Sequence, residues 1–253
     1  MPPRHMGMGL VGLLVLWQAG IWLFHPPAYI LPPPADVLAA FARQGGFLLR
    51  NSLVTIAEIA IGLGCGAVLG ALAALAAAAF PRAGRLIWPA VLVLQGLPVF
   101  VLAPILVLWF GFGIASKAIM ATIIIFFPVA SAFADGLRRT EPAILDAVAL
   151  TRATHWQTLR YIRAPLALPG LISGLRVAAP LAPIGAVVGE WVGASAGLGF
   201  VMVQANARMQ TDIVFAAMVL LAVLTLVLRL AVDVATARIT PWAPEGHLAN
   251  PDS

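Results

Sequence analysis

The sequence is poor in charged residues and in cysteine. Only 10% of its 253 residues are charged, 62% are hydrophobic, and the mean hydropathy is +1.00. Soluble chains carry about 25% charged residues, so this composition excludes an ordinary soluble domain. The single cysteine, Cys65, provides neither a disulfide framework nor a metal cluster. It lies in an apolar helical run, where we interpret it as a packing residue.

Side chains for catalysis are also lacking. The four histidines are scattered outside the apolar stretches, without metal-ligand spacing, and no nucleophile–base arrangement is evident. The one lysine, Lys117, follows Gly-Ile-Ala-Ser, so the GxxxxGK[ST] phosphate loop of an ATPase is impossible here. We therefore predict a non-enzymatic chain that binds no cofactor and no metal. Active transport would need energy from a partner.

Six apolar stretches approach or exceed the length of about 20 residues that a membrane-spanning helix needs. They cover residues 7–24, 53–80, 87–110, 116–134, 170–188 and 213–234. A signal peptide is the alternative for the first stretch, but no small-x-small cleavage site follows it. Nine arginines lie on the side of both termini, and three arginines and the lysine on the other. The apolar stretches and the positive-inside rule then predict an all-α membrane protein with both termini in the cytoplasm.

This topology divides the chain into four parts. Residues 1–25 form the N-terminus and first span, and residues 26–52 form a proline-rich periplasmic segment with an interfacial helix at 37–49. Residues 53–238 form the transmembrane core, in which 81–85 is a short basic turn on the inner side. Residues 239–253 form a disordered cytoplasmic tail.

Several residues within the spans suggest close packing or function. Gly62, Gly64, Gly66 and Gly70 allow neighbouring helices to approach closely. The third span contains Pro89, Pro98 and Pro104, which leave backbone carbonyls for neighbouring helices or a wet cavity to satisfy.

Charged residues near the span ends each have more than one interpretation. Glu58 either pairs with Arg50 at the interface or has a transport role. Arg176 either snorkels to the headgroups or acts at a gate. Asp233 lies four residues after Arg229, a spacing that predicts an ion pair on one helix face.

The longest interval without a span, residues 138–169, is cytoplasmic in this topology. It holds five of the fifteen cations: Arg138, Arg139, Arg152, Arg160 and Arg163. Apolar residues recur at helical spacing after Pro142, which predicts a first helix. Residues 152–156 interrupt this pattern, and a second helix at 157–164 is expected to end at Pro165 and Pro169. A polar helical hairpin between spans presents a surface to something outside the membrane.

Asp146-Ala-Val-Ala-Leu-Thr-Arg152 and the closing Leu168-Pro169 resemble the "EAA" loop of binding-protein-dependent ABC importer permeases. That motif runs E-A-A, three residues, G, about nine residues, then a hydrophobic residue, x and L-P. Asp146 replaces the usual acid, and Arg152 stands where the family has glycine. Because arginine adopts positive φ less readily than glycine, the turn is expected to differ in detail.

The resemblance implies the type I ABC importer fold in the bacterial inner membrane, with coupling helices between the fourth and fifth spans. It also implies an ATPase dimer that uses ATP and Mg²⁺, a second and identical permease subunit, and a periplasmic binding protein, but no nucleic acid. The expected ATPase-coupling residues are Asp146, Ala147, Val148, Arg152, Ala153, Thr154, His155, Trp156, Leu168 and Pro169. The alternative is a solvated connector whose arginines only set topology.

The segments 183–195 and 205–212 look like those of permeases for pyrimidine thiamin precursors, hydroxymethylpyrimidine or formylaminopyrimidine. Sulfonate, taurine and nitrate permeases share the scaffold and remain the alternative. The predicted substrate pathway contains Pro98, Pro104, Glu190 and Trp191. Glu190 could instead pair with Arg208 beside an interfacial tryptophan.

A secondary transporter or channel is the rival class of protein. It would require internally placed charges along the spans or an inverted repeat, and neither is apparent in the sequence.

Overall fold

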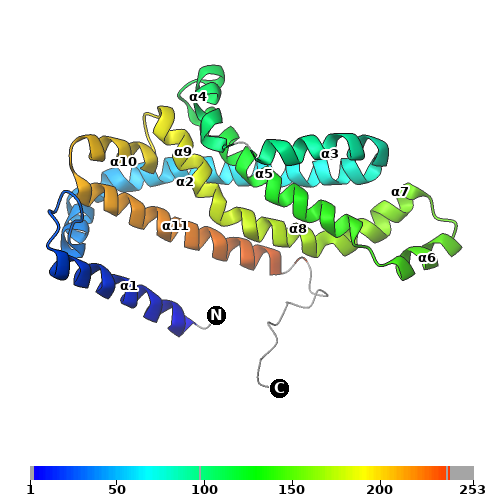
Figure 1. Ribbon diagram of the computed structural model, residues 1–253, viewed down its shortest axis with the longest axis horizontal. Helices are drawn as coiled ribbons and strands as arrows, with labels where there is room; N and C mark the ends of the chain where they lie inside the picture. The colour runs from blue at the N-terminus through cyan, green and yellow to red at the C-terminus, as the bar shows by residue number, and fades with distance from the viewer. Residues whose placement is uncertain (1–2, 97, 238, 240–253) are drawn as a thin grey trace.

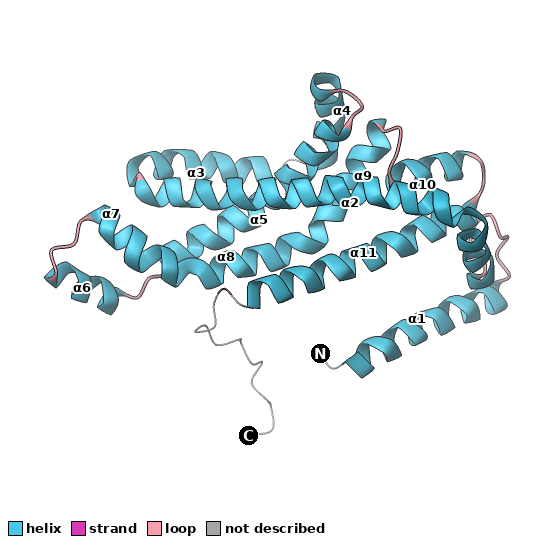
Figure 2. Cartoon of the chain, turned by 180° about the vertical axis from the view of Figure 1, so that it is seen from behind, coloured by secondary structure: helices cyan, strands magenta, loops and turns pink. Residues whose placement is uncertain are grey.

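The computed structural model describes residues 3–96, 98–237 and 239, which form helices joined by short loops (Figures 1 and 2). The longer helices are α1 (Pro3–Phe24), α2 (Pro34–Ala79), α3 (Pro81–Gln95), α4 (Val99–Phe110), α5 (Ile114–Arg138), α8 (Ala164–Ala178), α9 (Ala182–Gly193), α10 (Leu198–Ala207) and α11 (Thr211–Ala237). Two short helices, α6 (Pro142–Leu150) and α7 (His155–Thr158), form a hairpin at one end of the molecule. Helix α10 lies at the opposite end.

Four helical segments in the described part of the chain are long and apolar enough to cross a membrane: α2, α5, the continuous run 155–193, and α11. Large apolar side chains are exposed along them, for example Leu53, Val68 and Val223. Such surfaces suit contact with lipid or with other membrane helices. Helix α1 agrees with the predicted first span, and its Trp17 packs against Phe215 of α11 with ring centroids 5.3 Å apart.

Helix α5 occupies the centre of the fold and packs against α2, α8 and α9. Ile59 of α2 and Ala186 of α9 bury themselves against Ala121 and Ile125 of α5. Close approach depends on glycines: a Cβ atom on Gly66 would lie 2.7 Å from the Cβ of Ile125. Gly62 and Gly70 also face α5, so the predicted close approach is confirmed for three of the four glycines. It is wrong for Gly64, where an added Cβ would meet no atom within 4 Å.

Gly66→Val should therefore separate α2 from α5, while Gly64→Val should be tolerated. Overpacking a close contact costs about 1–3 kcal/mol, and the backbone oxygen of Thr122, 2.9 Å from the added Cβ, has little freedom to move. Thermal unfolding in detergent should show a lowered midpoint for Gly66→Val alone. Equal losses for the two variants would contradict this account of the interface.

The boundaries of two predicted elements near the N-terminal half differ from the structure. The predicted interfacial helix 37–49 and the second span belong to one long helix, α2, whose only non-helical residue is Gln44. The change of direction lies at Gln44, just before Gly45-Gly46, rather than near residue 50. Cys65 of α2 is exposed rather than packed within the chain.

The third predicted span is not one helix. The basic turn expected at 81–85 is the first turn of α3, which lies beside α2 in both views (Figures 1 and 2). Helix α3 ends at Gln95, and α4 begins after Pro98. Proline lacks an N–H and biases the preceding residue away from helix, which explains the break. At 12 residues, α4 is too short to cross a bilayer alone.

The prediction that a helix ends at Pro165 is also wrong. Residues 159–163 form a π-helical turn, and the chain continues through α8 with Pro165 in its first turn and Pro169 in its interior. In the wide turn the N–H of Ala164 donates to the carbonyl of Leu159. This rearrangement lets the helix pass a residue that has no N–H of its own. The α6–α7 hairpin is thus continuous with the predicted fifth span.

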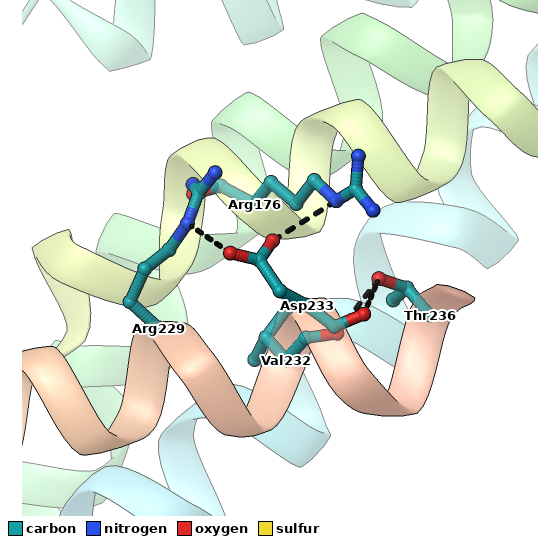
Figure 3. Close-up of polar contacts among 5 residues, drawn as sticks. All are labelled: Arg176, Arg229, Val232, Asp233 and Thr236. Carbon is teal, nitrogen blue, oxygen red and sulfur yellow. Dashed lines mark hydrogen bonds and ion pairs between the residues drawn. The ribbon is translucent and has the colours of Figure 1, made fainter. Parts of the chain in front are cut away.

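The predicted ion pair between Arg229 and Asp233 is confirmed, at 3.0 Å between Nε and Oδ2 (Figure 3). Arg176 of α8 joins it, with Nε 3.0 Å from Oδ1 of the same aspartate. The guanidinium of Arg229 also donates to the backbone carbonyl of Arg176. Arg176 is therefore held by α11 rather than extended freely towards headgroups, and the cluster joins α8 to α11. Residues 240–253 of the predicted tail lie outside the described part of the chain.

Candidate functional site

The α6–α7 hairpin leaves an apolar surface exposed. No residue of α6 is buried, and Leu150 at its end is 87% exposed. Trp156 and Tyr161 are also largely exposed. On α6, the half-buried residues Ile144, Leu145 and Val148 share one side, Leu150 lies on the opposite side, and Ala147 lies at the edge between the two. The hairpin therefore has an outward face without a partner in the described chain.

The second half of the hairpin is tied firmly to the transmembrane helices. Thr154 caps α7, accepting a hydrogen bond from the N–H of Gln157, whose side chain accepts in turn from the N–H of Thr154. The His155 Nε2 lies 3.2 Å from the carbonyl oxygen of Ala78 in α2. The ring of Trp156 meets Phe80 edge-on at 5.7 Å. A movement of α7 would therefore displace the end of α2 through these contacts.

Leu159 completes this connection. It is buried against Ala74 of α2, Phe133 and Leu137 of α5, and Ala167 of α8. A force applied to the exposed face of the hairpin reaches three membrane-spanning segments through packed side chains. This arrangement suits the transmission of rigid-body motion.

Arg152 occupies the turn between α6 and α7 with φ of +57°. This is the left-handed conformation that glycine adopts without strain and other residues adopt at a cost of about 1–2 kcal/mol. We expected the turn to differ in detail because arginine replaces glycine. Its backbone does not differ in this respect, since Arg152 adopts the conformation that suits glycine. Its side chain is exposed.

Arg152→Gly is expected to stabilise the turn by up to about 1 kcal/mol, because the strain disappears while glycine gains freedom in the unfolded chain. Arg152→Ala removes the guanidinium but keeps the strain, so it should give no such gain. Hydrogen exchange of the amides around residues 151–155 measures the difference. Equal protection in the two variants would mean that the backbone at this position is not strained.

The structure places the other predicted coupling residues in two different regions, the hairpin and the interior of α8. Asp146 and Ala147 are exposed on α6, and Ala153 is half-buried in the turn. Leu168 and Pro169 instead lie inside α8, half-buried and away from the outward face of the hairpin.

A second polar site lies at the opposite end, where α9 is joined to α10. Glu190 of α9 is only 2% exposed. Its Oε1 accepts a hydrogen bond from Thr55 Oγ1 at 2.7 Å, and its Oε2 accepts from the N–H of Gly199. The buried carboxyl of Glu58 lies close to that of Glu190. We call Asn51, Thr55, Glu58, Lys117 and Glu190 the outer polar cluster, because they lie away from the α6–α7 hairpin.

The outer polar cluster holds the α9–α10 loop against α2. Asn51 accepts from the N–H of Gly197 at 2.9 Å, and Thr55 accepts from that of Leu198 at 2.8 Å. Lys117 of α5 donates to the carbonyl oxygens of Phe112, at 2.8 Å, and of Gly193. Gly197 has φ of +111°, and a Cβ there would lie 2.2 Å from Glu190 Oε1. The loop thus requires glycine where the carboxylate approaches it.

The alternative pairings expected for the two glutamates are not formed. Arg50 donates to the carbonyl of Gly46 rather than to Glu58, and Glu190 is paired within the outer polar cluster rather than with Arg208. Of the predicted pathway residues, Trp191, Pro98 and Pro104 are exposed, whereas Glu190 is buried. Helices α4 and α9 do pack together.

The sequence contains a signal for the outer polar cluster that lies outside the loop motif. Asn51, Thr55 and Glu58 are spaced four and three residues apart, so they share one helix face at the start of a long apolar run, residues 59–79. A polar stripe on an apolar helix indicates a buried polar partner. The contacts of Ala78 and Phe80 with the hairpin had no comparable signal.

Comparisons with known proteins agree with this geometry. Residues 66–243 match the family described as "Binding-protein-dependent transport system inner membrane component". A protein of Haemophilus influenzae named "Probable ABC transporter permease protein" is 43% identical over 87% of this chain and 90% of its own length. The formylaminopyrimidine transport permease protein ThiX of Halalkalibacterium halodurans is 34% identical over 91% of this chain and 92% of its own length.

The riboflavin transport system permease protein RibX of Chloroflexus aurantiacus is 33% identical, covering 95% of this chain and 91% of its own. The fold also resembles a chain of the MetNI methionine ABC transporter solved in inward-facing conformations. The TM-score is 0.68 at 20% identity, covering 78% of this chain and 98% of that one.

The chain belongs to the family of binding-protein-dependent transport system inner membrane components. It is a membrane-spanning permease subunit of an ABC transporter.

Proposed function

We propose that this chain forms the pathway of an ATP-driven importer for a pyrimidine precursor of thiamin, hydroxymethylpyrimidine or formylaminopyrimidine. The observation that carries the proposal is the likeness to the formylaminopyrimidine permease over nearly the whole chain. The riboflavin permease is almost as similar, and both of those substrates are nitrogen heterocycles. Sulfonate and taurine permeases are 28% identical and give the alternative substrate class.

In this proposal, two identical permease chains enclose the pathway, and a periplasmic binding protein delivers the substrate. An ATPase dimer that uses ATP and Mg²⁺ docks on the hairpins, while this chain binds neither cofactor nor metal. The exposed Leu150 and Trp156 support the docking face, and the His155–Ala78 contact supports its link to α2. The arginines of the hairpin support a cytoplasmic location for it and for both termini.

Within the pathway, we assign substrate contact to Trp191 and a positioning role to Glu190. Trp191 is 52% exposed, so its ring is available to stack on a flat heterocycle. Both oxygens of Glu190 are already engaged by Thr55 and Gly199. Pro98 and Pro104 lie on α4, which packs against the helix that carries Trp191.

The test is uptake by proteoliposomes that contain this chain with its ATPase and binding protein. Competition among hydroxymethylpyrimidine, formylaminopyrimidine, riboflavin and taurine decides the substrate. Inhibition by the two pyrimidines alone supports the proposal, and inhibition by taurine alone overturns it. Uptake that proceeds without the ATPase would overturn the importer assignment itself.

A further inference from the structure

A cavity of about 380 Å³ lies at the hairpin end of the molecule, between α2, α3, α5 and the π-helical turn. Its walls include alanines of α2, Trp88 of α3 and Leu137 of α5. Arg85, Arg138 and Arg163 complete the lining, and no carboxylate is among the described lining residues. The volume falls in the range of about 300–1,000 Å³ that is usual for ligand sites.

The guanidinium of Arg163 lacks a partner at one nitrogen, and that of Arg138 is only weakly paired. Nε of Arg163 is buried and has no hydrogen-bond partner in the described structure. Arg138 lies over the ring of Trp88 at 5.3 Å and pairs with Asp135 at 2.9 Å, but the aspartate is half-exposed, which weakens the pair. A buried guanidinium nitrogen without an acceptor is costly, so the site favours an anion that supplies one.

The position of Arg163 adds a second observation. It is the last residue of the π-helical turn, and such turns occur frequently at functional sites. The neighbouring cavity wall contains Ala78, whose carbonyl contacts His155 of the coupling hairpin. A ligand in the cavity would therefore contact both the π-helical turn that follows the hairpin and the end of α2 that the hairpin packs against.

We propose that this cavity binds the phosphate headgroup of an anionic phospholipid from the adjacent leaflet. Arginine forms bidentate, charge-assisted hydrogen bonds with phosphate oxygens. The apolar walls formed by alanines, Trp88 and Leu137 suit the glycerol and first methylenes, which a free phosphate ion lacks. The lining comes from the last residues of α2 and of α5, so the site lies at the end of the membrane-spanning helices, where headgroups are found. The bound lipid braces the hairpin against α2.

Native mass spectrometry of the full-length chain tests this, with phosphatidylglycerol and phosphatidylcholine as probes. The wild type should retain phosphatidylglycerol about tenfold more tightly than phosphatidylcholine. Arg163→Gln and Arg85→Gln should each weaken retention of phosphatidylglycerol about tenfold, the value of one charge-assisted hydrogen bond. Arg82→Gln and Arg139→Gln are matched controls, because both residues are exposed at the same end but do not line the cavity.

Three results would overturn the proposal. The first, which needs no variant, is equal retention of the two lipids by the wild type. The second is an equal loss in all four variants, which would indicate diffuse surface charge. The third is displacement of the lipid by excess inorganic phosphate, which would identify a free-phosphate site. Thermal unfolding with and without phosphatidylglycerol is a second measurement, in case a variant folds poorly. The lipid should raise the unfolding midpoint of the wild type and leave that of Arg163→Gln unchanged.

Discussion

Ala147→Glu is expected to abolish ATP-driven uptake without preventing membrane insertion. Ala147 is exposed on α6, so a glutamate there disturbs no contact within the described chain. In the docked complex proposed above, its carboxylate would be taken from water without a partner, at a cost of about 2–5 kcal/mol. Such a loss lowers affinity for the ATPase by about 30-fold or more. Uptake by proteoliposomes and copurification of the ATPase measure the two effects.

Ala149→Glu is the matched control. The residue type, the helix and the added charge are the same, but Ala149 lies two positions further on and so projects from nearly the opposite side of α6. It should retain most uptake. If both variants are fully active, the hairpin is only a solvated connector. If both are inactive with the ATPase still bound, added charge harms the hairpin by a route other than docking.

Glu190→Ala is expected to destabilise the protein by about 3–5 kcal/mol, as breaking a buried charged network typically does. It leaves the Thr55 hydroxyl and the Gly199 N–H without their acceptor, and removes a negative charge close to Lys117. Glu190→Gln keeps one acceptor oxygen and should lose about half as much or less. Thermal unfolding in detergent gives the comparison.

The neighbouring variant Trp191→Ala separates stability from transport. Trp191 is half-exposed, so its loss should change the unfolding midpoint little while reducing uptake of a heterocyclic substrate. Trp191→Phe should restore part of that uptake, because it retains an aromatic face. A midpoint for Glu190→Ala equal to that of the wild type would show that the outer polar cluster does not hold the α9–α10 loop.

The sequence by itself determined the membrane class, the six apolar stretches and the position of the helical hairpin between two of them. These depend on properties that lie along the chain: runs of apolar residues, the distribution of arginine, and the order Asp146-Ala147 to Leu168-Pro169. The Arg229–Asp233 pair was predictable for the same reason, since both partners lie on one helix. The absence of a phosphate loop likewise required no structure.

Only the tertiary structure decided how helices distant in sequence pair with one another. The partners of Glu190 come from α2 and the α9–α10 loop, and Arg176 meets Asp233 across two helices. Local rules also failed at proline. Pro98 separates α3 from α4, whereas the chain passes Pro165 through a π-helical turn. Which outcome follows a proline depends on whether the freed carbonyls find other partners, and the fold supplies or withholds those partners.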